Sequence, residues 1–188
     1  MKLLACPKCH QQLHLENKTL KCENNHCYDI SKRGYINLLL NPDKATNNPG
    51  DSKESLVARK AYLNKGYYDP ILNQVITCID EFKHQDDLSI LDLGCGEGYY
   101  TQGLKKHFEN SDIYGLDISK IAIDMATRYR KDVTWLVGNS KNIPILNHSL
   151  DFICALFTVV NQDELKRALK EDGYIIHVTA NNQHLIEI

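Results

Sequence analysis

The sequence predicts an α/β fold, a parallel sheet with helices on both faces, preceded by a small metal-binding module. Two observations support this prediction. Apolar segments of strand length alternate with segments of helical periodicity from about residue 89 onward, which is typical of right-handed strand–helix–strand units. Four closely spaced metal-ligating side chains also fall within the first 27 residues, where too few apolar residues are present to build a core of their own.

The metal-binding module comes first along the chain. Cys6-Pro7-Lys8-Cys9 has the spacing of a metal knuckle, and Cys22 begins a second pair after a hairpin-like stretch. Either His26 or Cys27 can complete this pair, so the fourth ligand stays open. Tetrahedral zinc would supply the folding free energy of so short a segment. The alternative is a redox dithiol, which requires a neighbouring strand and helix that the sequence does not show.

The expected boundaries follow from composition and periodicity. Residues 1–40 form the zinc ribbon, closed by an apolar strand over 35–40, and 41–52 form a linker rich in Asn, Pro, Lys and Asp. Residues 53–188 form the larger domain, which begins with two helices. Its expected helices are 53–66, 72–82, 99–108, 120–130 and 163–169, and its expected strands are 89–93, 113–116, 133–137, 152–157 and 174–179.

A glycine-rich turn follows the first strand of this domain. In Asp92-Leu93-Gly94-Cys95-Gly96-Glu97-Gly98 the glycines remove side chains that would keep a nucleoside ligand away from the main chain. The second strand ends in Asp117, an acceptor for ribose hydroxyls. Asn139 follows the third strand, where it can read an adenine edge or cap a helix. This order of strand, turn, helix, strand and acid predicts a nucleoside-cofactor site.

The carboxylates near the turn indicate which cofactor. Asp92 and Glu97 would repel the pyrophosphate of a dinucleotide, whereas they suit a sulfonium and an ammonium group. The pattern G-x-G-x-G also departs from the dinucleotide fingerprint. It resembles the S-adenosylmethionine motif of Rossmann-like methyltransferases. A nicotinamide or flavin site and a tight turn without any ligand are the alternatives.

Composition and charge fit this interpretation. No apolar run among the 188 residues approaches a membrane span, so we expect no membrane partner and a cytoplasmic protein. Seven cysteines without a signal peptide indicate reduced thiols or metal ligands. Residues 1–65 carry 11 Lys and Arg against 6 Asp and Glu, whereas the remainder carries 11 against 18. A basic module beside an acidic domain favours a polyanionic partner.

With both motifs described, the chain resembles the RlmA family, bacterial methyltransferases that act on guanine N1 in a hairpin of large-subunit ribosomal RNA. The resemblance implies a Rossmann-like class I fold, S-adenosyl-L-methionine and zinc as cofactors, and ribosomal RNA as partner. It also implies zinc ligands at Cys6, Cys9, Cys22 and His26, and cofactor contacts at Tyr68, Gly96, Glu97 and His184. The matching segments are Cys6–Cys9, Cys22 with His26, 34–39, 49–52, Ala58-Arg59, Tyr68, 91–100, 115–120 and His184-Leu185.

A complete class I domain has a further helix and two strands after the fifth strand, so we expect a C-terminally truncated fold. The outer edge of strand 174–179 would then be exposed, which favours a homodimer or other self-association. No catalytic residue is assigned, since the fourth strand lacks the Asn/Asp-Pro-Pro-aromatic signature and Asp163 and Glu164 can be explained by their place at a helix start. The alternative functions are a zinc-bearing RNA-binding or regulatory protein without turnover, and a methyltransferase for a small molecule or protein.

Overall fold

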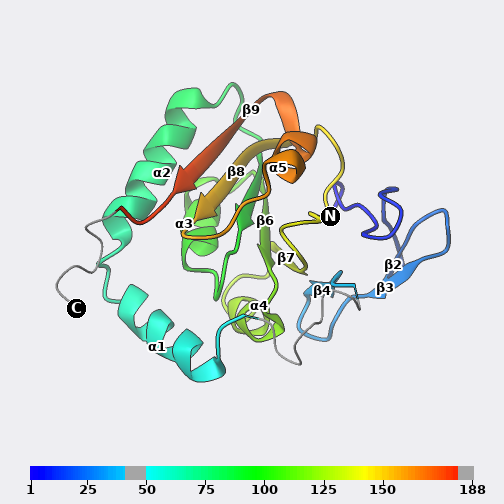
Figure 1. Cartoon of the computed structure of the whole chain (residues 1–188), viewed down its shortest axis with the longest axis horizontal. Coiled ribbons are helices and arrows are strands. Elements are labelled where there is room, and N and C mark those ends of the chain that lie inside the picture. Colours follow the sequence, from blue (N-terminus) through cyan, green and yellow to red (C-terminus); the bar gives the residue numbers. More distant parts are fainter. Residues whose placement is uncertain (41–49, 182–188) are drawn as a thin grey trace.

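A computed structural model describes residues 1–40 and 50–181 (Figure 1). Within these residues, no helix is both long enough and apolar enough to cross a bilayer. The strands are β1 (His14–Glu16), β2 (Thr19–Lys21), β3 (Cys27–Asp29), β4 (Ile36–Asn37), β5 (Ser89–Leu93), β6 (Asp112–Asp117), β7 (Thr134–Val137), β8 (Leu150–Leu156) and β9 (Leu169–Val178). The helices are α1 (Lys53–Leu63), α2 (Asp69–Phe82), α3 (Tyr99–His107), α4 (Lys120–Ala126) and α5 (Gln162–Ala168).

The central sheet has six strands in the order β4-β7-β6-β5-β8-β9, and every neighbouring pair is parallel. The chain runs outward from β5 to β6 and β7, then returns to the other side of β5 for β8 and β9. The strand order therefore reverses between β5 and β8. Parallel sheets bind ligands at the carboxyl end of such a reversal. The predicted Rossmann-like parallel sheet is confirmed.

Side chains alternate between the two faces of the sheet, as strand geometry requires. Ile90 of β5 lies in one buried cluster with residues of α2, α3 and α4, whereas the next residue, Leu91, lies in a second cluster with residues of α5. Both clusters consist of fully buried aliphatic side chains for the most part. Helices thus cover both faces, and the two apolar layers hold the sheet between them.

The zinc-ribbon segment packs on the α5 side of the sheet, at the right of Figure 1. Its sheet is formed by β1, β2 and β3, all antiparallel. Leu4, Leu13 and Leu20 belong to the same buried cluster as the sheet residue Leu91. The backbone continues the contact, because Leu4 forms an antiparallel bridge with Ile145. The two parts of the chain therefore share one hydrophobic core.

Strand β4 differs from its expected role as the closing strand of the ribbon. It pairs in parallel with β7 as the outermost strand of the central sheet, and Ile36 also bridges to Ile30 of the ribbon. Ile36 is buried in the cluster that contains Leu91, and Tyr35 is buried in the cluster that contains Ile90, so both faces of this segment are apolar. It thus connects the ribbon to the sheet. Most of the expected 41–52 linker lies outside the described residues.

The other elements of the larger domain lie where they were predicted, with shifts at some ends. Helix α1 ends at Leu63 rather than near residue 66, and β9 begins at Leu169 rather than at residue 174. Helix α2 begins three residues before the expected start, since Pro70 suits the first turn of a helix. Helix α4 ends at Ala126 rather than at residue 130, and the chain then turns so that the carbonyl of Arg130 accepts the indole N–H of Trp135. That bond fixes the ring of Trp135 beneath α4 and the glycine-rich turn.

Candidate functional site

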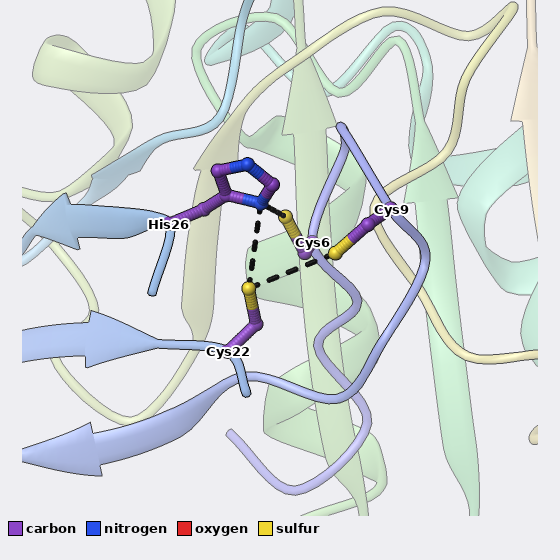
Figure 2. Close-up of side chains that lie close together, drawn as sticks. All are labelled: Cys6, Cys9, Cys22 and His26. Atoms are coloured by element: carbon purple, nitrogen blue, oxygen red, sulfur yellow. Dashed lines mark hydrogen bonds between the residues drawn. The ribbon is translucent and has the colours of Figure 1, made fainter. Parts of the chain in front are cut away.

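Four metal-ligating side chains converge in the ribbon. Cys6 and Cys9 come from the N-terminal loop, and Cys22 and His26 flank the turn between β2 and β3 (Figure 2). Their ligand atoms all lie within 4.8 Å of one another. The Sγ atoms of Cys9 and Cys22 are 3.6 Å apart, and His26 Nδ1 lies 3.4 Å from Cys6 Sγ and 3.5 Å from Cys22 Sγ.

These separations fit one tetrahedral zinc ion. Zn–S bonds of about 2.3 Å and Zn–N bonds of about 2.0 Å place neighbouring ligands about 3.5–3.8 Å apart. The structure also separates the open alternatives for the fourth ligand. Cys27 is exposed, and its Sγ lies 3.4 Å from the carbonyl oxygen of Asn25 instead of facing the cluster.

The glycine-rich turn lies at the carboxyl end of β5, and its three glycines have three different roles. A Cβ on Gly94 would come within 2.4 Å of the Thr158 hydroxyl, so glycine lets the ends of β5 and β8 approach. Gly96 faces a cavity and takes φ of 56°. A Cβ on Gly98 would come within 2.6 Å of the Trp135 ring. Gly98 therefore serves internal packing, which corrects the expectation that all three glycines clear the way for a ligand.

Asp117 ties this turn to the end of β6. Its Oδ2 accepts a hydrogen bond of 2.9 Å from Gly96 N, and its Oδ1 accepts one of 2.7 Å from Ser119 N. Burial raises the pKa of Asp117, and these two N–H donors oppose the rise. A hollow of about 120 Å³, here called the side hollow, lies beside this carboxylate. It is lined by Asp117, Ile118, Asn139 and Thr158, among others, and Gly94 forms part of its wall.

Asn139 shapes the far side of the side hollow. Its Oδ1 accepts a hydrogen bond of 3.0 Å from Lys141 N, in a short turn after β7. The residue therefore stabilises a turn rather than a helix, and it lines the side hollow together with Asp117. An amide at this place suits the edge of a purine base.

The main cavity, of about 580 Å³, shares Gly94 with the side hollow as a lining residue. This volume lies within the usual range of small-molecule sites. The cavity is lined by Arg59, Tyr62, Leu63, Tyr68, Gly94, Cys95, Gly96, Glu97, Tyr99, Tyr100, Leu156, Phe157 and Ala180. Aromatic rings thus form most of one wall, and Tyr68 and Phe157 meet edge to face at 6.1 Å. The buried Tyr100 hydroxyl has no hydrogen-bond partner in the described part of the chain.

The two acids of the turn have different surroundings. Glu97 is 3% exposed and lines the main cavity, and burial raises its pKa although the charges of Arg59 and Lys60 oppose the rise. Asp92 is 1% exposed and lines neither hollow. It accepts a short hydrogen bond from the Thr101 hydroxyl of α3, because its position in β5 directs its side chain to the face of the sheet that α2, α3 and α4 cover. Asp92 thus braces the turn from beneath, whereas the sequence suggested a contact with the cofactor.

The residues present fit an S-adenosylmethionine-like ligand. Two hollows share Gly94, Asp117 lines the smaller one, and Glu97 and Tyr100 line the larger one. His184, the remaining expected contact, lies outside the described residues.

Arg59 and Phe157 are among the cavity residues to which the sequence assigned no role. Arg59 reaches the cavity from α1, and Phe157 directly follows β8 with φ of 56°, in the left-handed region that few non-glycine residues adopt. In the sequence, an aromatic residue at the end of an apolar strand was the signal that could have identified Phe157 as a cavity residue. Of the two acids considered near this strand, Glu164 already has partners in the protein, since it accepts a hydrogen bond from Ile143 N at 2.7 Å and pairs with Arg167 at 2.9 Å.

Two family models match this chain, one over the ribbon and one over the larger domain. The family model described as "RlmA, N-terminal", a zinc ribbon, matches residues 4–45. The model described as "Methyltransferase domain" matches residues 90–173. The first match contains the four clustered ligands, and the second contains the glycine-rich turn and strands β5 to β8.

Individual relatives extend the agreement over the whole chain. The 23S rRNA (guanine(748)-N(1))-methyltransferase of Streptomyces fradiae is 28% identical over 190 residues, which cover 100% of this chain and 67% of the relative. YxjB of Bacillus subtilis (strain 168), provisionally named a 23S rRNA (guanine-N(1)-)-methyltransferase, is 30% identical over 99% of this chain and 67% of its own length. The chain thus spans about two thirds of the length of these relatives.

A solved structure shows the same fold. It is a provisionally assigned S-adenosyl-L-methionine-dependent methyltransferase from Methanococcus maripaludis, with a TM-score of 0.54 and 23% identity. The match covers 67% of this chain and 66% of that one.

Proposed function

Because this chain belongs to the RlmA family of methyltransferases, we propose that it transfers a methyl group from S-adenosyl-L-methionine to N1 of a guanine in 23S ribosomal RNA. The observation that carries the proposal is the pair of hollows joined at Gly94. One hollow has the polar groups that suit a nucleoside, and the other has aromatic walls that suit an acceptor base.

On the cofactor side, each residue has a proposed task. Asp117 accepts from the ribose hydroxyls and Asn139 reads the adenine edge in the side hollow. Gly94 and Gly96 allow the ligand to approach the main chain, and Glu97 neutralises the positive charge of its amino acid part. Tyr68 and His184 are proposed contacts from the family resemblance, and Asp92 acts by holding the turn. Bound S-adenosylmethionine supplies a methyl group already activated on sulfonium.

On the acceptor side, the chain contributes position and exclusion of water. A guanine must leave the base stack to enter the main cavity, and aromatic side chains receive flipped bases by stacking. Phe157 is the aromatic residue that follows the carboxyl end of β8; it lines the same cavity as Glu97 and is 42% exposed. Its left-handed backbone holds the ring at the cavity wall. Methyl transfer then depends on alignment rather than on a covalent intermediate.

The ribbon is the proposed RNA-recognition module. Cys6, Cys9, Cys22 and His26 are its proposed zinc ligands, and residues 1–40 its proposed extent. Its exposed basic residues are Lys2, Lys8, Lys18, Lys32 and Arg33. Such a surface binds phosphates without reading sequence. A ribosomal substrate also places the protein in the cytoplasm.

Labelled methyl transfer to unmodified 23S ribosomal RNA tests the proposal. We expect incorporation into one guanine, located by primer extension, because a methyl group on N1 blocks Watson–Crick pairing. Methylation only of protein or of small molecules would favour the other methyltransferase class. Cofactor binding without any transfer would favour an RNA-binding protein that lacks turnover.

A matched pair of variants tests the acceptor side. Phe157→Ala should lower kcat/KM for RNA roughly 10- to 100-fold, since stacking on one base contributes about 1–3 kcal/mol. Cofactor affinity should stay within twofold in calorimetry. Phe82→Ala is the control, because Phe82 is similarly exposed (45%) but contacts Tyr174, which pairs with Phe152 in β8, and does not line the main cavity. Equal effects of the two substitutions would remove Phe157 from the acceptor site.

A further inference from the structure

The main cavity contains one feature that the cofactor assignments leave unused, the guanidinium group of Arg59. Among the described residues that line this cavity, Arg59 is the only basic one. It projects from α1 toward the glycine-rich turn, and its Nη1 would lie 3.4 Å from a Cβ on Gly96. A single cation therefore stands where the ligand must pass closest to the main chain.

The present partner of this guanidinium is easily exchanged. Arg59 forms an ion pair with Asp51, and the two side chains are 46% and 45% exposed. Exposed pairs of this kind contribute only about 0–1 kcal/mol. Asp51 follows Gly50, where an added Cβ would come within 2.8 Å of Ser119 Cβ. The pair therefore spans from α1 to the segment that lies over the ribose end of the site, and it can open at little cost.

S-adenosylmethionine presents a matching anion. Its amino acid part carries a carboxylate as well as an ammonium group, and the cavity already holds the buried carboxylate of Glu97. A second carboxylate beside Glu97 would be repelled unless a cation accompanied it. A guanidinium is the side chain that binds carboxylates with two parallel hydrogen bonds.

We propose that Arg59 binds the α-carboxylate of the cofactor, exchanging Asp51 for the ligand. This inference rests on the proposed function and adds a binding residue to it. The electrostatics of the site agree, because the charge of Arg59 already opposes the rise in the pKa values of both Glu97 and Asp117. The guanidinium thus lies near both acids and can screen the ligand's carboxylate from them.

Calorimetry with two ligands tests the exchange in the full chain. One ligand is S-adenosylhomocysteine, and the other is 5′-deoxy-5′-(3-aminopropylthio)adenosine, which lacks only the carboxylate. Arg59→Gln should weaken the first at least tenfold and the second less than twofold. Arg59→Lys should give an intermediate loss, since it keeps the charge without the fork. Arg128→Gln is the control, because Arg128 is an exposed arginine that pairs with Asp124 away from the cavity.

A further variant tests the role of the present partner. Asp51→Asn should bind S-adenosylhomocysteine as tightly as the wild type or up to about fivefold more tightly, because a competing carboxylate is removed. A loss of affinity in this variant would overturn the exchange.

Equal losses for both ligands in Arg59→Gln would show that Arg59 only supports the local structure, and unchanged affinity would show that it does not contact the cofactor. Either result overturns the inference while the proposed function stands. If the wild-type chain binds neither ligand, the proposed function falls and the inference falls with it.

Discussion

Replacing Asp92 with asparagine should change the way in which stability depends on pH. The side chain is 1% exposed, and burial is the main reason why the pKa of Asp92 rises from 3.8 to about 7. Hydrogen bonds from Thr101 oppose this rise, whereas the charges of Asp117 and Glu97 add to it. The folded protein therefore holds a proton at Asp92 over a pH range in which the unfolded chain has already released it.

The sign and size of the effect follow from this difference. Between about pH 4 and pH 7 the folded state binds more protons than the unfolded state, so the free energy of unfolding falls as pH rises. At about 1.4 kcal/mol per pKa unit, the carboxylate costs about 2 kcal/mol at pH 5 and about 4 kcal/mol at pH 8. A neutral amide avoids this cost at every pH. The change in polar contacts on substitution adds an offset that does not depend on pH.

We therefore expect the stability of Asp92→Asn, relative to the wild type, to be about 2–3 kcal/mol more favourable at pH 8 than at pH 5. Urea unfolding at both pH values measures this, with the fluorescence of Trp135, the single tryptophan, as the probe. Asp132→Asn is a control that should show almost no difference between the two pH values, because hydrogen bonds from Arg130 lower the pKa of Asp132 and its carboxylate is charged in the folded and unfolded states throughout this range. An identical pH dependence in Asp92→Asn and the wild type would refute the reasoning.

Three further predictions test other parts of the structure. We expect about one zinc ion per chain, and Cys22→Ser should release it and lower the melting temperature of the protein. Cys27→Ser should keep the zinc ion and the wild-type melting temperature. Full zinc content in Cys22→Ser would contradict the ligand set. Asp117→Ala should weaken S-adenosylmethionine by roughly 1–3 kcal/mol in calorimetry, and no loss would remove the ribose assignment. Ile175→Lys should reduce self-association through the outermost strand, β9, in light scattering, and unchanged association would exclude that edge.

Much of the fold could be predicted because its signals are local. Strand β5 was expected over the residues that form it, since an apolar run bounded by a glycine-rich turn identifies a buried parallel strand. The clustering of Cys6, Cys9 and Cys22 likewise followed from spacing. Such features need only neighbouring residues to be recognised.

The main differences depend on contacts between distant segments. Strand β4 has only two residues and finds its partner in β7, a hundred positions away, so no local pattern places it in the central sheet. The packing role of Gly98 depends on Trp135, and the reach of Arg59 into the cavity depends on where α1 lies. For the same reason Asp92 looked like a ligand contact, because sequence alone does not say which face of β5 it occupies.

The shared core of the ribbon and the central sheet has a consequence for target choice. Leu13 and Leu20 of the ribbon and Leu91 of the sheet pack in one cluster, and β4 joins the two parts within a single sheet. This leaves no hinge between them in the described chain. If the proposed function holds, the distance between the phosphate-binding surface of the ribbon and the aromatic cavity is then fixed. An RNA hairpin would be methylated at whichever guanine its own shape brings to that distance, and lengthening its stem should move the modified position.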